Sequence, residues 1–224
     1  MRAFCVPESM RIQAFAIYAL FPVLALPLAG LAQADCSGTL SAPLHSGSAL
    51  TIDSVSLGMK IVRTNGNAPD TVRVSCSSSS SDESSRIHMK LSGDASKERL
   101  KVTGDSAHNR NPELRIEVPR HTNLRIRMAA GEVTIDGIEG DKDCELTAGQ
   151  ITISDARAQS YRNVDASVDI GEVKAAAYGQ DMGGFFRHFH RKSLDGDYHL
   201  HAHVMTGEID LLGSAQDKHG AVED

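Results

Sequence analysis

The chain of 224 residues contains no tryptophan, and only 4% of its residues are aromatic. Aromatic side chains supply much of the buried area of a thick globular core. Their scarcity, beside abundant Val, Ile, Leu, Ser, Thr and Gly, favours thin layers of β-strands over a thick core with a deep pocket. The length predicts one domain.

Positive charge is also in short supply. The chain has 23 Lys and Arg residues against 29 Asp and Glu residues, so its formal net charge is −6. Broad binding of nucleic acid requires a basic surface, and anionic lipid attracts basic segments. We therefore expect no nucleic-acid partner and no electrostatic attachment to a membrane.

A long apolar run is found near the amino terminus, where Ile12 to Leu31 is interrupted only by Gln13. Two arginines precede or flank it, and Ala32-Gln33-Ala34 has the small-x-small pattern of a signal-peptidase site. We predict a signal peptide over residues 1–34, cleaved after Ala34. An uncleaved anchor is the alternative, and two prolines in the run argue against it. The mature chain is then periplasmic or secreted, with no stable membrane anchor.

Cysteine is sparse, with four residues in all, and Cys5 leaves with the predicted signal peptide. Export favours oxidation of thiols, so we expect a disulfide between Cys36 and Cys76. Cys144 then remains free. Its neighbours alternate with it and are acidic, which favours a small buried hydrophobe over a reactive thiol.

The remaining chain divides by composition. Residues 35–49 are rich in Ser, Gly and Pro and are expected to form a flexible lead-in, and residues 214–224 a disordered tail. Residues 50–213 hold short alternating runs such as Leu114-Arg115-Ile116-Glu117-Val118, which predict strands of about five residues with one buried face. No stretch of the mature chain has a convincing helical period.

Within this strand-rich region, a short pattern occurs four times: a small or apolar residue, a glycine, Glu or Gln, and a β-branched residue. The repeat glycines are Gly131, Gly149, Gly171 and Gly207. A unit this short cannot bury its apolar face alone, so the copies must stack. We expect an elongated stacked β-strand repeat, similar to a β-solenoid, in which Ile138–Gly140 turns the chain and Cys144–Thr147 runs back before the next copy.

Leu114–Pro119, followed by Asn123–Ile126 and the repeated glycine steps, resembles the bacterial "putative adhesin" β-strand repeat family of exported envelope proteins. The resemblance covers roughly Leu50 to Leu212. It implies an all-β, right-handed stacked body with a surface or envelope role, and it supplies no catalytic motif. The chain departs from the pattern at Tyr178 to Lys192.

Histidine is concentrated in one region. Half of the ten histidines lie within sixteen positions, at His188, His190, His199, His201 and His203. Alternate residues of a strand share a face, and imidazole is a ligand for Zn, Cu and Ni. A metal site is one hypothesis, with His188-Phe189-His190 folding over the face and Asp195 or Asp197 as a further ligand. The alternatives are histidines on an exposed strand face and a surface that responds to pH.

Gly183 to Phe189 joins two glycines to three of the six phenylalanines. We consider two structures for it. One is a mobile loop with an apolar tip that contacts a partner. The other is a cap on the open end of the strand stack, where an edge would otherwise be exposed.

The chain lacks a phosphate-binding glycine loop, a Gly-x-Ser-x-Gly elbow and a His-Glu-x-x-His helix. We predict an exported, non-catalytic β-repeat protein without a cofactor, which acts in adhesion or envelope interaction through a protein or glycan partner. Self-association stays open. The alternatives are a periplasmic metal-binding protein that uses the histidines, and a carbohydrate-active β-helix enzyme.

Overall fold

The computed structural model describes residues 31–66, 70–78, 84–104, 112–154, 156 and 159–213. This part of the chain is all-β, as predicted, with a short 3-10 turn, η1 (Ala176–Tyr178), between β10 and β11. No helix among these residues has the length and apolar character that crossing a membrane requires. Most of the predicted signal peptide, and the predicted tail at 214–224, lie outside the described residues.

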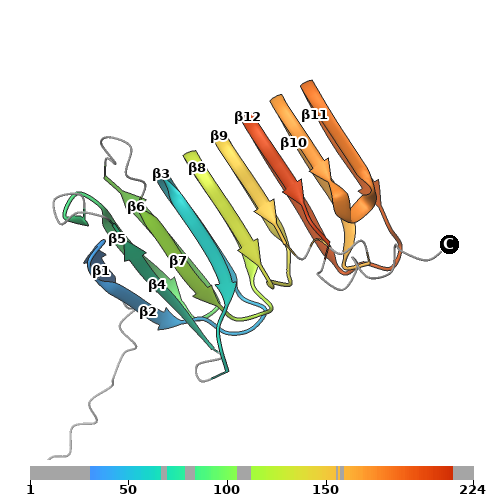
Figure 1. The fold of residues 1–224 in the computed structure, drawn as a ribbon. Coiled ribbons are helices and arrows are strands. Elements are labelled where there is room, and N and C mark those ends of the chain that lie inside the picture. The colour runs from blue at the N-terminus through green and yellow to red at the C-terminus, as the bar shows by residue number, and fades with distance from the viewer. Residues whose placement is uncertain are drawn as a thin grey trace, which may run out of the picture.

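The strands form one hydrogen-bonded network, shown in Figure 1. The amino-terminal strands are β1 (Ala32–Asp35), β2 (Thr39–Pro43), β3 (Ala49–Arg63), β4 (Thr71–Ser77), β5 (His88–Asp94), β6 (Lys97–Thr103) and β7 (Glu113–Val118). The carboxyl-terminal strands are β8 (Asn123–Asp136), β9 (Lys142–Ile153), β10 (Tyr161–Ala175), β11 (Gln180–Lys192) and β12 (Tyr198–Leu211).

The long strands double back at their middle. β8 has 14 residues and would extend over about 45 Å if straight. The link from Asp136 to Lys142 spans at most about 20 Å, yet β9 starts beside the start of β8, with Leu124 opposite Lys142. The end of β8 must therefore lie near its own beginning. The expected short strands are the two halves of longer bent strands.

This bending makes two layers. The first half of β3 pairs with β6 through Ala49–Asp53, and its second half pairs with β7 through Gly58–Arg63. One layer therefore continues through β6, β5 and β1, and the other through β7, β4 and β2. The core lies between them, because both halves of a bent strand point their apolar residues inward. In β8 these are Leu124, Ile126 and Met128 before the bend and Val133 and Ile135 after it.

The repeat glycines stack at the bends. Gly131, Gly149, Gly207 and Gly171 lie side by side in the register of parallel β8, β9, β12 and β10. Each has a positive φ, between 126° and 148°. A Cβ on Gly149 would lie 1.8 Å from the carbonyl oxygen of Gly131. Only glycine allows both the conformation and this close approach.

The order of the copies in space differs from their order in the sequence. β12 lies between β9 and β10, as the red-orange strand between yellow and orange in Figure 1 shows. β10 and β11 form an antiparallel hairpin at the end of the sheet. After β9 the chain therefore forms β10 at a distance of two strand positions and then β11 at the end of the sheet. β12 forms afterwards and lies between β9 and β10.

One sequence-based expectation agrees with the bent strands and another is corrected. The segment Cys144–Thr147 does run back before the next copy, because it belongs to the first half of β9, which is parallel to the first half of β8 and therefore opposite in direction to the second half that precedes the turn. Residues 35–49 are not a flexible lead-in, because β2 within them pairs with β4 and places Leu40 and Leu44 in the core. The segment is rich in serine, so its composition did not indicate that Leu40 and Leu44 are buried.

A buried lysine closes the turn between β8 and β9. Lys142 is 2% exposed, and its Nζ donates hydrogen bonds to the carbonyl oxygens of Ile138 (2.9 Å) and Gly140 (3.3 Å) and to the Tyr161 hydroxyl. The same ammonium lies 4.9 Å from the centre of the Tyr161 ring. The carbonyl groups of the tight turn are thereby satisfied inside the core, as buried polar groups require.

Candidate functional site

The outer face of the first strand halves carries two rows of polar side chains that cross the sheet from strand to strand. Because the parallel strands are in register, residues from five strands line up in each row. One row runs Arg125, Asp143, His201, Asp165 and His190, and the next runs Arg127, Glu145, His203, Ser167 and His188. Positive or imidazole groups thus alternate with carboxylates along much of this face.

Three histidines surround one carboxylate, and we call this group the Asp165 cluster: Asp165, His188, His190 and His201. Nε2 of His188 lies 3.1 Å from Oδ1 of Asp165, and Nδ1 of His190 lies 3.6 Å from Oδ2. Nδ1 of His201 lies 3.9 Å from Oδ1. All four side chains are partly exposed. The cluster joins three neighbouring strands, β12, β10 and β11.

Strand alternation explains how the cluster forms. Phe189 is 7% exposed and packs against the Tyr178 ring, with 5.1 Å between the ring centres. Because neighbouring residues of a strand face opposite sides, burying Phe189 turns both His188 and His190 outward. The segment was expected to fold over the histidine face as a loop. It is instead edge strand β11, and β10 separates it from β12.

The other predicted ligands lie elsewhere. His203 contacts Ser167, with 3.0 Å between its Nδ1 and the hydroxyl oxygen, and lies 4.0 Å from Asp169. His199 is exposed, and its backbone N–H donates to Asp141. Asp195 and Asp197 are exposed residues of the link before β12 and belong to neither described group of metal-ligating side chains.

Sequence reasoning missed Asp165. The signal was present, since Val164 and Ala166 are buried on either side of it and the alternation places Asp165 on the outer face. The identity of its neighbours was not readable, because β12 enters the sheet beside β10 out of sequence order.

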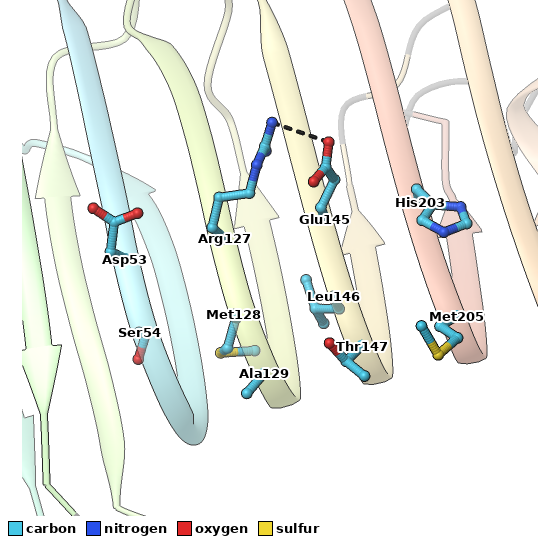
Figure 2. A pocket seen from close by; sticks show the side chains of 10 residues that line it. All are labelled: Asp53, Ser54, Arg127, Met128, Ala129, Glu145, Leu146, Thr147, His203 and Met205. Carbon is cyan, nitrogen blue, oxygen red and sulfur yellow. Dashed lines mark ion pairs between the residues drawn. The ribbon is translucent and has the colours of Figure 1, made fainter.

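A second group, Asp143, Glu145 and His201, lies on β9 and β12. Arginine already occupies its carboxylates: Nη2 of Arg127 lies 2.6 Å from Asp143 and 3.0 Å from Glu145, and Arg125 lies 3.5 Å from Asp143. Figure 2 shows Arg127 directed toward Glu145 above a hollow of about 460 Å³ that extends to His203 and Met205. The charges of Asp143 and Glu145 are therefore balanced by Arg125 and Arg127.

A second hollow, of about 670 Å³, follows the glycine stack and is lined by Glu132, Gln150, Glu172 and Glu208. Lys174 hydrogen-bonds to Glu208, which lowers the pKa of that carboxyl, and lies 3.5 Å from Glu172. Burial raises the pKa of the neighbouring Asp210, and a hydrogen bond with Glu208 raises it further.

An exposed apolar patch lies beside the bends at the β11 end of the sheet. It consists of Ile170 and Met205, each 49% exposed, with Phe185 (67%) and Phe186 (79%). Ile170 and Phe185 are opposite each other in the β10–β11 pair. β11 therefore covers the edge of β10 and buries Phe189, while its other two phenylalanines face outward. The segment is therefore a strand that covers the sheet edge, as the cap predicts, and not a loop. Contact of its exposed phenylalanines with a partner stays a prediction.

The cysteines take separate places. Cys36 and Cys76 are joined by a disulfide with 4.8 Å between their Cα atoms. Cys144 is free and fully buried, and burial raises the pKa of its thiol to about 12. A thiol that stays protonated at neutral pH is a poor nucleophile.

No protein-family model and no curated protein matches the chain. A solved structure described as a putative cell adhesion protein from Clostridium sporogenes ATCC 15579 is similar, with a TM-score of 0.44 and 12% sequence identity. The match covers 77% of the present chain and 97% of the other one. A likeness this distant says nothing of what the present chain binds.

Proposed function

We propose that the protein is an exported, non-catalytic β-repeat protein of the bacterial cell envelope, which binds a protein or glycan partner through its surface. We also infer that the bent, parallel, in-register strands form a right-handed β-solenoid-like body of the adhesin-like family that the sequence resembles. The glycine stack supports this inference, since it repeats one bend at equal register through β8, β9, β12 and β10.

The observation that carries the binding role is the apolar patch of Ile170, Met205, Phe185 and Phe186. Contiguous exposed apolar side chains with a polar rim mark interaction sites in soluble proteins. Here the rim is formed on one side by the glutamates that line the hollow along the glycine stack. On the other side it is formed by the two rows of polar side chains on the outer face. Two exposed phenylalanines at the end of a sheet present large apolar area with little conformational entropy to lose.

The chemistry of the described residues supports a non-catalytic role. Glu208 hydrogen-bonds to Lys174, which lowers the pKa of its carboxyl and disfavours it as a general acid. Cys144 is buried and protonated. The hollow along the glycine stack lies at repeated positions, so it presents similar groups on successive strands, namely Glu132, Gln150, Glu208 and Glu172.

The test is saturable binding of the purified mature protein to isolated cell envelopes, measured by co-sedimentation. We expect Phe185→Ser combined with Phe186→Ser to weaken binding by about tenfold or more, because hot-spot aromatic residues carry a large share of interface energy. Leu194→Ser is the matched control, since Leu194 is 97% exposed outside the patch. Pretreating the envelopes with protease separates a protein partner from a glycan.

Absence of saturable binding by the wild-type chain would contradict the proposal. So would equal binding by the double variant and the Leu194→Ser control. Circular dichroism and thermal melting of each variant establish that a loss of binding is not a loss of fold.

A further inference from the structure

We propose that Asp165, His188, His190 and His201 bind one divalent transition-metal ion of the Zn, Cu and Ni class, which fastens edge strand β11 to β10 and β12. This site goes beyond the proposed binding role and does not depend on it. It lies on the outer face of the first strand halves, whereas the exposed phenylalanines lie beside the bends.

The ligand chemistry fits this class of ion. Imidazole nitrogen suits Zn, Cu and Ni, and a carboxylate completes mixed sites of this kind. The cluster offers three imidazoles and one carboxylate from three strands. Ligands from separate strands can converge on one ion more readily than alternate residues of a single strand. His199, His201 and His203 all lie on β12, so by themselves they do not converge.

The distances fit as well. A tetrahedral Zn²⁺ with bonds of about 2.0 Å places its ligand atoms about 3.3 Å apart. The His188 and His190 nitrogens lie 3.1 Å and 3.6 Å from the two Asp165 oxygens. One ligand atom from each of these three residues lies within 4.8 Å of the others. Small side-chain rotations close this set around an ion. His201 lies 3.9 Å from Asp165 but outside the 4.8 Å set, so it supplies the fourth position by a larger rotation of its side chain.

The charge around Asp165 distinguishes it from the neighbouring acidic group. Among the described residues, the ion-pair partners of Asp165 are histidines alone. Among these residues Asp165 has no guanidinium or ammonium partner, so a divalent cation meets no fixed positive charge there. Asp143 and Glu145 are instead held by Arg127 and Arg125, whose guanidinium groups repel a cation. We therefore assign the ion to the β10–β11 side of His201.

The strands hold the ligands in place. His188 and His190 flank buried Phe189, Asp165 lies between buried Val164 and Ala166, and His201 between buried Leu200 and Ala202. The backbone registers Asp165–His201 and Asp165–His190 are fixed by the ladders on both sides of β10. Binding therefore requires little backbone rearrangement, and the ion adds a cross-strand link at the end of the sheet.

The experiment uses the mature chain without a histidine tag. Zn²⁺, Cu²⁺ and Ni²⁺ are titrated separately by calorimetry, and metal content is measured after equilibrium dialysis. We expect one ion per chain. Asp165→Asn and the double variant His188→Ala with His190→Ala should each weaken affinity by about 100-fold, since even outer partners of metal ligands contribute 10- to 100-fold. His199→Ala is the matched control, because His199 is an exposed histidine on the same strand as His201.

A second measurement follows the link between strands. The metal should raise the melting temperature of the wild-type chain and of His199→Ala, because a ligand that binds only the folded state stabilises it. It should not raise that of the Asp165→Asn chain. These readouts do not involve envelope binding, so failure of the metal site and failure of the binding role are distinguishable.

Two results would overturn the site. One is a wild-type chain that retains no ion after dialysis in any of the three titrations. The other is a loss of affinity in His199→Ala equal to that in the cluster variants, which would show that the histidines bind metal adventitiously as separate surface groups.

Discussion

At the residue scale, the hydrogen bonds of the Asp210 carboxyl group depend on whether that group is protonated. With both carboxyl groups ionised, its Oδ1 is buried without a hydrogen-bond partner, while Oδ2 accepts from Gln150 at 2.7 Å. A proton on Asp210 supplies the missing contact, because it is donated to Glu208. Burial and this hydrogen bond both raise the Asp210 pKa.

We expect Asp210→Asn to stabilise the protein modestly at pH 7, by about 1 kcal/mol at most, because solvent screens this partly exposed group. The raised pKa means that ionising Asp210 costs more in the folded state than in the unfolded state, so this group's contribution to stability is lost as pH rises through the raised pKa. The amide mimics the protonated acid, since its oxygen accepts from Gln150 and its nitrogen donates to Glu208. Urea unfolding at several pH values measures the difference.

The gain should shrink as pH falls from the raised folded-state pKa toward the ordinary value of 3.8, and it should vanish below that value, because Asp210 is then protonated in both states. Asp197→Asn, at an exposed position, is the control and should leave stability within about 0.5 kcal/mol of the wild type. A loss of stability at pH 7 in Asp210→Asn, or a gain independent of pH, would show that the ionised carboxylate is the stabilising form.

At the scale of elements, the bend glycines decide whether strands can stack. Gly149→Ala should destabilise the protein by about 3 kcal/mol or more, from a strained positive φ and a severe clash. Its φ is 126°, and a Cβ would lie 1.8 Å from the Gly131 carbonyl oxygen. Thermal and urea unfolding measure the loss.

Gly183→Ala is the matched control for this prediction. Gly183 lies beside the same hollow, but the nearest atom to an added Cβ would be 3.9 Å away, on the Glu172 side chain. We expect stability within about 0.5 kcal/mol of the wild type. Comparable losses in the two variants would mean that close backbone approach at the bend is not what selects glycine.

The same elements show what the sequence could and could not reveal. The glycine repeat and the all-β class followed from local pattern. The length of the strands did not, because apolar alternation stops at Met128 and resumes out of phase at Val133, so one bent strand resembles two short ones. The order of strands was also hidden, since the copies are locally alike and nothing in β12 marks β9 as its neighbour.

At the scale of the whole molecule, the disulfide pins the place where the chain crosses between layers. Cys36 lies between β1, which pairs with β5 in one layer, and β2, which pairs with β4 in the other. Cys76 is in β4, 40 residues further along. The predicted signal-peptidase cut after Ala34 falls inside β1, so cleavage would leave Asp35 as the only residue of that strand.

Replacing both Cys36 and Cys76 with Ser should lower the free energy of unfolding by about 2–4 kcal/mol. This is the usual effect of removing a disulfide that closes a loop of this length. Dithiothreitol should destabilise the wild-type chain by a similar amount and leave the double variant unchanged. Unfolding in guanidinium chloride with and without the reductant measures both. A reductant effect on the double variant would point to a different disulfide in solution.

The insertion of β12 between β9 and β10 limits how such a protein can grow. An ordinary repeat array lengthens when copies are added at its end, because each new unit docks on the last one. Here the last strand of the described residues, β12, is interior, and the position at the end of the sheet belongs to antiparallel β11. Duplicating the carboxyl-terminal copy would therefore supply a strand with no free parallel edge beside β12. Within the described sheet, the antiparallel hairpin of β10 and β11 thus occupies the position at which a further parallel strand would have to add.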